Sequence, residues 1–195
     1  MPTGVAIQDA REQLFDAAER VLLRDGPSAL TSRAVTSEAG YAKGVLHRHF
    51  ADFDSFLAEL VLDRTARLEE QAAALRDAAG TGTVAGNLTR AVSDLFESVA
   101  REILALVTSR HELLARLRPT TPTGLPVLSE ATAMVAAYLV IERDRGRIAV
   151  DADVDVLAPM LIGAAHLLFA GRRDAPPESE TVQRLVTGVV AGVLR

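Results

Sequence analysis

TSRAVTSEAGYAKGVLHRHF, residues 31–50, is the stretch that decides the fold. It has the pattern of two short helices joined by a tight turn. Thr31 is a good N-cap for a first helix over 32–39, and Gly40, which adopts positive φ without penalty, suits the turn. The second helix is expected over about 43–49. This spacing predicts a helix-turn-helix, in which the first helix braces the second.

The second of these short helices is rich in groups that suit DNA. Lys43, His47, Arg48 and His49 lie close together, and Lys43 is the only lysine of the chain. A helix-turn-helix places its second helix in the major groove, where long donors reach base edges and other side chains bind phosphate. A solvated charged face is the ordinary alternative for such a cluster. The spacing around it is what favours contact with DNA.

Composition restricts the class of protein. The 195 residues are 49% apolar and only 4% aromatic, a globular and helix-rich composition with ample length for a core. The chain has no cysteine, which excludes disulfides and thiolate metal sites, and a reducing cytoplasm fits best. We expect no membrane span, since no apolar stretch reaches the roughly 20 residues required, and no signal peptide, since the N-terminus lacks a basic region followed by an apolar run. The net charge of −5 does not oppose DNA binding, because contact depends on local charge.

Helical periodicity continues along the rest of the chain, and no stretch shows the alternation of a strand. We therefore expect an all-α fold of about nine helices, with a three-helix, helix-turn-helix domain over 1–52 and a helical bundle over 53–195. The segments 119–126 and 171–179 are expected loops. The helices outside the central stretch are expected over 7–25, 52–79, 83–107, 109–117, 129–145, 156–170 and 180–195.

The last two predicted helices favour a second copy of the chain as partner. Residues 156–170 carry no charge, and a helix that is apolar all round is buried on every side. Because it lies so near the end of the chain, we do not expect its own chain to enclose it. Gly188 and Gly192, one turn apart, permit close approach of another helix. We expect a two-fold four-helix interface that contains Leu157, Leu161, Ala164, Ala165, Leu168, Val186, Val189, Val190 and Val193.

Residues 10–62 resemble the N-terminal domain of the TetR family of bacterial transcriptional regulators. The positions that carry the resemblance follow the family pattern without a gap: Thr31, Arg33, Val35, Ala39, Gly40, Gly44, Leu46, His49 and Phe50. It implies a homodimer that binds a palindromic operator in double-stranded DNA. It further implies a ligand-binding and dimerisation domain, whose small-molecule effector moves the second helices of the two helix-turn-helix units out of register with the operator. It also implies DNA contacts by Ser32, Arg33, Lys43, Val45, His47, Arg48 and His49.

Three positions depart from the family pattern. Ala42 stands where Ser or Thr usually caps the second helix, His47 where a Tyr contacts the DNA backbone, and Phe53 where a Lys contacts phosphate. Each lost phosphate contact lowers the affinity for DNA and its salt dependence. A ligand-binding helical dimer with weakened or lost DNA binding is therefore the second hypothesis.

The effector site is poorly marked. Seven side chains are expected to face the interior and suit a mostly apolar effector with one or two polar contacts, although ordinary core is the alternative for each. They are Phe96, Val99, Ile103, His111, Met134, Tyr138 and Met160. His166 is expected to be a satisfied interface histidine.

An enzyme is the least favoured hypothesis, and we expect no cofactor and no metal. A helical bundle that holds two irons needs Glu-x-x-His pairs, and no histidine of the chain has a glutamate three residues before it. There is also no glycine-rich phosphate loop.

Overall fold

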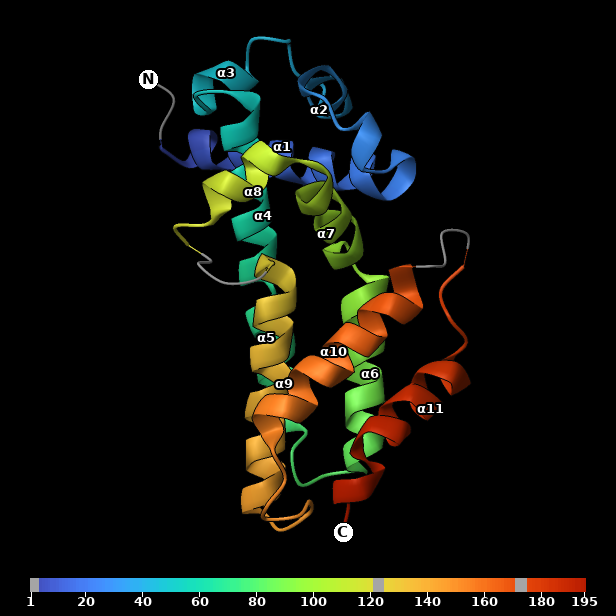
Figure 1. Cartoon of the computed structure of the whole chain (residues 1–195). Coiled ribbons are helices and arrows are strands. Elements are labelled where there is room, and N and C mark those ends of the chain that lie inside the picture. Colours follow the sequence, from blue (N-terminus) through green and yellow to red (C-terminus); the bar gives the residue numbers. More distant parts are fainter. Residues whose placement is uncertain (1–3, 121–124, 171–174) are drawn as a thin grey trace. The chain divides into compact units, whose positions relative to one another are not determined.

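A computed structural model of the chain describes residues 4–120, 125–170 and 175–195, with side chains described from residue 10 onward. These residues form eleven α-helices, α1 to α11, and two short 3-10 turns, without a strand, as the all-α prediction required (Figure 1). The chain divides into two compact units. Unit 1 contains residues 1–64 and 102–123, and unit 2 contains residues 65–101 and 124–195.

Unit 1 is built from the helix-turn-helix and the helices that support it. Gly26, at φ 79°, follows the last residue of the first helix. The Thr31 Oγ1 accepts the N–H of Ala34 at 3.1 Å, so Thr31 acts as the predicted N-cap. The Asp52 Oδ1 accepts the N–H of Ser55 at 2.6 Å and caps the helix that follows it in the same way. The helices are α1 (Gly4–Asp25), α2 (Ser32–Glu38), α3 (Leu46–His49), nearly all of α4 (Phe53–Ala66), most of α7 (Ala100–Ser109) and α8 (His111–Leu117).

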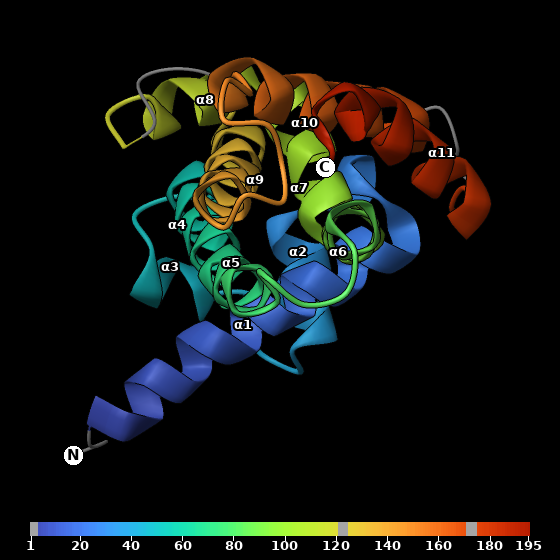
Figure 2. The same ribbon diagram turned by 90° about the horizontal axis from the view of Figure 1, so that it is seen from below.

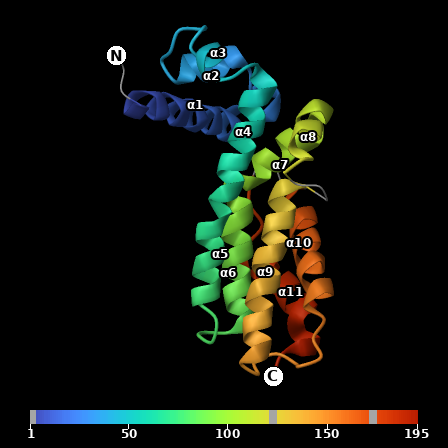
Figure 3. The same cartoon turned by 90° about the vertical axis from the view of Figure 1, so that its left-hand side faces the viewer.

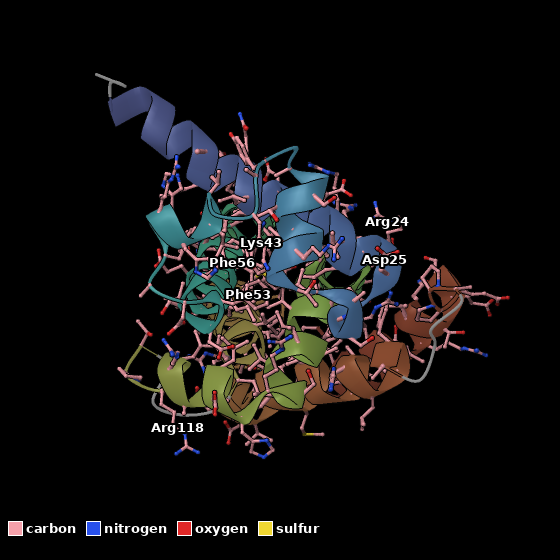
Figure 4. All side chains as sticks on the ribbon, turned by 90° about the horizontal axis from the view of Figure 1, so that it is seen from above. Arg24, Asp25, Lys43, Phe53, Phe56 and Arg118 are labelled. Atoms are coloured by element: carbon pink, nitrogen blue, oxygen red, sulfur yellow. The ribbon has the colours of Figure 1, made fainter. Side chains whose placement is uncertain are left out.

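Four of the six phenylalanines hold these helices together. The rings of Phe50 and Phe56 meet edge-on with centroids 5.0 Å apart, and Phe15 of α1 lies 5.7 Å and 5.6 Å from them. Phe53 stacks on Phe56 at 5.6 Å; both are labelled in Figure 4. Leu46, the only buried residue of α3, completes the attachment of that short helix. Packing therefore holds α3, here called the reading helix, because four residues are too few to form a stable helix alone.

A buried arginine joins α4 to α1. Arg64 is only 4% exposed, and its guanidinium contacts the carboxylates of Asp16, Glu19 and Asp63 at 2.7, 2.6 and 2.5 Å. Burial opposes the charge of Arg64, but the three carboxylates, Glu19 above all, outweigh it and raise the pKa of Arg64 above its ordinary value. The pairing therefore holds α1 and α4 together without an unpaired buried charge.

Unit 2 is a helical bundle. The helix α9 packs on α5 and α10, and α11 packs on α6 and α10. Figures 2 and 3 both show α5, α6 and α9 running side by side. None of the described helices is long and apolar enough to cross a membrane. The helices are α5 (Leu68–Asp77), α6 (Val84–Glu97), α9 (Pro126–Asp144), α10 (Val154–Ala170) and α11 (Ser179–Val190).

Polar groups in the core of unit 2 form one network. The Asn87 Nδ2 donates to the Tyr138 Oη at 3.1 Å and to two carbonyls of the turn between α5 and α6. Glu142 is fully buried, and its Oε1 accepts from the Gly80 N–H at 3.2 Å and from Arg147 at 3.4 Å. Burial, together with the hydrogen bond to Glu142, raises the pKa of Tyr138 well above its ordinary value. The network pins the α5–α6 turn to α9.

Two of the nine expected helices are each broken in two, which gives eleven. The helix expected over 52–79 is interrupted at Arg67, for which the structure gives no side-chain reason. The helix expected over 83–107 breaks after Glu97, where Ser98 is extended at ψ −178°. The Ser98 Oγ donates to the Leu95 carbonyl at 2.6 Å and accepts the N–H of Ala100. Such local serine bonds compete with the helix. The apolar stripe continues across both breaks, so periodicity alone could not reveal them.

Two further predicted boundaries are wrong. The second helix of the helix-turn-helix, expected over 43–49, is regular only in α3, because Ala42 offers no capping hydroxyl and Gly44 lowers helix propensity. A tighter turn precedes it, with the Val45 N–H on the Ala42 carbonyl at 2.9 Å. The last helix ends at Val190, after which Leu194 pairs with Ile148. The expected loops 119–126 and 171–179 lie partly outside the described residues.

Candidate nucleic-acid interface

The side chains predicted to contact DNA lie on α2, on α3 and on the turn between them. Opposite to them, Leu46 is fully buried and fixes the orientation of α3. Lys43 is labelled in Figure 4. The Oγ of Ser32 is buried without a hydrogen-bond partner among the described residues. The exposed members of the set are Arg33, Lys43, His47 and Arg48, and the half-buried ones are Ser32, Val45 and His49.

The single carboxylate of residues 31–50 is neutralised from α1. Glu38 accepts from the Arg20 Nε at 2.9 Å and from the Arg24 Nη1 at 3.0 Å. These two hydrogen bonds hold the pKa of the Glu38 carboxyl below its ordinary value, so it stays ionised and paired. Arg24 also pairs with Asp25, and both are labelled in Figure 4. The positive charges of the interface are therefore not offset by Glu38.

Arg11 of α1 holds the end of the reading helix. Its Nη1 donates to the His49 carbonyl at 3.1 Å, one of the carbonyls left without a partner at a helix C-terminus. Its guanidinium lies 4.4 Å from the centroid of the Phe50 ring and forms an ion pair with Glu59 of α4. Three contacts from one side chain thus set where α3 ends and where its exposed face points.

Residues 14–60 match the family model described as bacterial regulatory proteins, tetR family. The chain carries the TetR-family helix-turn-helix domain. The resemblance predicted from the sequence is therefore confirmed, although no curated protein matches the chain by sequence.

Solved structures of transcriptional regulators, two of them described as TetR-family, share the fold over nearly the whole chain. One from Agrobacterium tumefaciens has a TM-score of 0.72 at 13% identity and covers 97% of this chain and 100% of its own. One from Mesorhizobium loti MAFF303099 has a TM-score of 0.71 at 16% identity, and the match covers 97% of this chain and 98% of that one. The ketosteroid transcriptional regulator KstR2 of Mycobacterium tuberculosis has a TM-score of 0.63 at 19% identity, and the match covers 95% of each chain. The family and these neighbours are transcriptional regulators and not enzymes.

The residues predicted to line the effector site do not come together in one unit. Ile103 and His111 belong to unit 1, where Ile103 is buried and His111 exposed, and Met160 of α10 is 54% exposed. The break after Glu97 leaves Phe96 on α6 and Ile103 on α7, so these two residues do not lie on one continuous helix. The remaining members, of which all but half-buried Val99 are buried, lie in unit 2: Phe96, Val99, Met134 and Tyr138.

Four of the nine residues predicted at the dimer interface lie in the core of the single chain. The prediction that α10 is not enclosed by its own chain is wrong on one side of the helix, which packs on α9, α11 and α6. An uncharged helix carries no pattern that tells its inner face from its outer face. The four buried residues are Leu161, Ala165, Val186 and Val190, and the half-buried ones are Leu157, Ala164, Leu168, Val189 and Val193.

Three polar side chains of unit 2 were missed or misjudged. Glu142 lies four residues after Tyr138, so the helical period that turned Tyr138 inward also predicts a buried glutamate. Nothing in the sequence marks Asn87 as its partner. His166, expected to be satisfied, has a buried Nδ1 without a partner in the described chain, and its ring lies 6.3 Å from that of Phe96. No group of three or more potential metal ligands gathers within the described residues.

Proposed function

We propose that this TetR-family chain is a cytoplasmic, ligand-responsive repressor that binds a palindromic operator as a homodimer and is released by a small, mostly apolar effector. One observation carries the DNA-binding part. The exposed face of α3 and its turn presents Lys43, His47 and Arg48 beside Arg33, while Glu38 is neutralised by α1. Local positive charge of this kind draws a protein to the phosphate backbone.

The exposed side chains divide into two roles. Lys43 and Arg48 are long donors that suit the O6 and N7 acceptors of guanine in the major groove. His47 and Ser32 suit phosphate oxygens, and Val45 suits the methyl group of thymine. Base contacts specify the sequence and phosphate contacts set the register of the helix on the duplex.

An exposed apolar stripe on α10 supports the homodimer. Val156, Met160 and Leu167 are 49%, 54% and 76% exposed. Their spacing, with exposed Gly163 between them, places them on one face of the helix. Exposed apolar groups that gather in one patch are typical of a protein interface. A two-fold dimer through this face supplies the second reading helix that a palindrome requires.

Unit 2 is where we place the effector. Apart from the network around Glu142 its interior is mostly apolar, and the rings of Phe96 and Phe169 stack at 5.2 Å beside His166. The unpartnered Nδ1 of His166 offers the polar contact that orients an otherwise apolar ligand. Expected compounds are therefore apolar molecules with one hydrogen-bonding group.

The DNA-binding proposal is tested with the double variant Lys43→Ala and Arg48→Ala. Operator DNA selected from a random pool by the wild-type protein is used in gel shifts, and we expect the variant to lose the specific shift while its circular dichroism spectrum and dimer mass are unchanged. The matched control is Arg90→Ala with Arg118→Ala, which removes the same charge from exposed positions outside residues 31–50. A specific shift retained by the first variant contradicts the assignment of α3. Failure of the wild type to enrich any DNA favours the ligand-binding dimer without DNA binding.

A further inference from the structure

Phe53, which stands where the family pattern has a phosphate-binding Lys, has a different contact in this chain. Its ring stacks on Phe56 on one side and lies 5.7 Å from the guanidinium of Arg110. A guanidinium within about 6 Å of an aromatic centroid is attracted to the ring face. Arg110 is the extended residue between α7 and α8. Phe53 therefore contacts an arginine of the protein at the position where the family pattern has a lysine that contacts DNA.

The remaining groups of Arg110 hold the start of α4 and the entry to α2. Its Nη1 lies 3.7 Å from the Asp54 Oδ1 in the first turn of α4. Its Nη2 donates to the Leu30 carbonyl at 3.2 Å, immediately before the cap of α2. One side chain therefore joins the α7–α8 junction to two parts of the helix-turn-helix domain.

A second arginine, one helical turn and a half further on, contacts the same end of α4. The Arg116 Nη2 donates to the Asp52 Oδ2 at 2.8 Å, and its Nη1 donates to the Ser55 Oγ at 2.7 Å. Asp52 is also the N-cap of α4 through its other oxygen. The Asp52 carboxylate therefore accepts from the Ser55 N–H and from Arg116 at the same time, one through each oxygen.

We propose that Arg110 and Arg116, here called the arginine bracket, are positioning residues for DNA recognition, with Phe53 as their apolar support. The bracket fixes the first turn of α4, where Phe56 packs edge-on against Phe50 at the end of α3. Residues 110–116 therefore order the reading helix without touching DNA. This inference rests on the proposed function and adds to it the group of residues that pre-orders the interface.

The geometry separates this role from phosphate binding. The donors of Arg110 and Arg116 are directed at acceptors of the protein itself, and their side chains are 32% and 43% exposed. Each phosphate contact makes the negative slope of log affinity against log salt concentration steeper by about 0.9. A positioning residue changes the affinity without changing that slope, because it avoids the cost of ordering the surface on binding.

The first test compares operator affinity and its salt slope in the wild type and in the variant Arg110→Ala with Arg116→Ala. We expect about tenfold weaker binding with an unchanged slope, since the surface must then be ordered at association. Arg118→Ala, at an exposed arginine at the end of α8, is the control and is expected to bind as the wild type does. Unchanged affinity of the double variant overturns the inference, and so does a slope that falls by about 0.9 for each arginine removed.

The second test does not depend on DNA, so it remains decisive if the wild type selects no operator. Amide hydrogen exchange is measured at Phe50, Ser55 and Phe56, whose N–H groups bond to Leu46 and Asp52. We expect exchange at these amides to be about tenfold faster in the double variant and unchanged in Arg118→Ala, because loss of the bracket permits local opening. Equal exchange in all three proteins overturns the inference.

Phe53→Leu serves as a milder variant in case the double variant fails to fold. It keeps an apolar contact with Phe56 but removes the ring face under Arg110, and we expect about threefold weaker operator binding and faster exchange at the same amides. Values equal to those of the wild type in both measurements would show that Phe53 is not the support of the bracket.

Discussion

At the scale of single residues, Arg64 is the clearest case of a side chain whose loss the structure makes costly. It is buried and paired with three carboxylates. Removal leaves those carboxylates without their common partner, so Arg64→Ala is expected to lower the free energy of unfolding by about 3 kcal/mol, less than for a fully buried cluster because the acids are partly solvated. Urea unfolding at neutral pH measures the difference. Arg76→Ala, at a surface pair with Glu69, is the control and is expected to change little.

Asp52 predicts a pH dependence. The Ser55 N–H and hydroxyl and Arg116 hold the pKa of the Asp52 carboxyl below its ordinary value. Its contribution to stability is therefore complete above the pKa of an unfolded aspartate, about 3.9, and is lost as the pH falls through the lower pKa of the folded state. Asp52→Asn is expected to be less stable than the wild type at pH 7, with a difference that shrinks below about pH 4. A difference that is the same at pH 7 and pH 3 would show that the charge of Asp52 is not involved.

At the scale of elements, two glycines of the helix-turn-helix give opposite predictions. Neither Gly40 nor Gly44 has any atom within 4 Å of where a Cβ would lie, but Gly40 has a φ of 70° and Gly44 does not have a positive φ. Gly44→Ala is expected to raise the free energy of unfolding by up to about 1 kcal/mol by favouring the helix, and Gly40→Ala to lower it by about 1 kcal/mol through backbone strain. Thermal unfolding of both variants is the measurement. Effects of equal sign would contradict the backbone conformations assigned to this turn.

The elements also show what the sequence could predict. The helix-turn-helix depends on local signals such as the Thr31 cap and the Gly40 turn, so its place and its exposed cationic face were predictable. The break at Ser98 depends on hydrogen bonds of one serine side chain to the nearby backbone, and the inner face of α10 depends on packing between helices. Periodicity reports neither. The expected effector lining was therefore divided between the two units, and the partners of Glu142 and Arg110 could not be predicted at all.

At the scale of the whole molecule, the account predicts a dimer held by the exposed stripe of α10. Leu167→Glu places a charge at the most exposed leucine of that stripe and is expected to convert a dimer into a folded monomer at micromolar concentration, because burying an unpaired carboxylate is costly. Light scattering gives the mass of each. Leu23→Glu, at an exposed leucine of α1, is the matched control and is expected to remain a dimer. A wild-type mass that stays monomeric at every concentration would contradict the dimer.

The central claim is that the exposed face of α3, presented twice by a symmetric dimer, reads a specific DNA sequence. Selection of bound DNA from a random double-stranded pool by the wild-type protein tests it most directly. The account predicts enrichment of a palindrome whose half-sites are separated by about one turn of the duplex or a multiple of it, roughly 10 base pairs each. A pool that shows no enriched sequence, or one enriched only for a single unrepeated site, would contradict it.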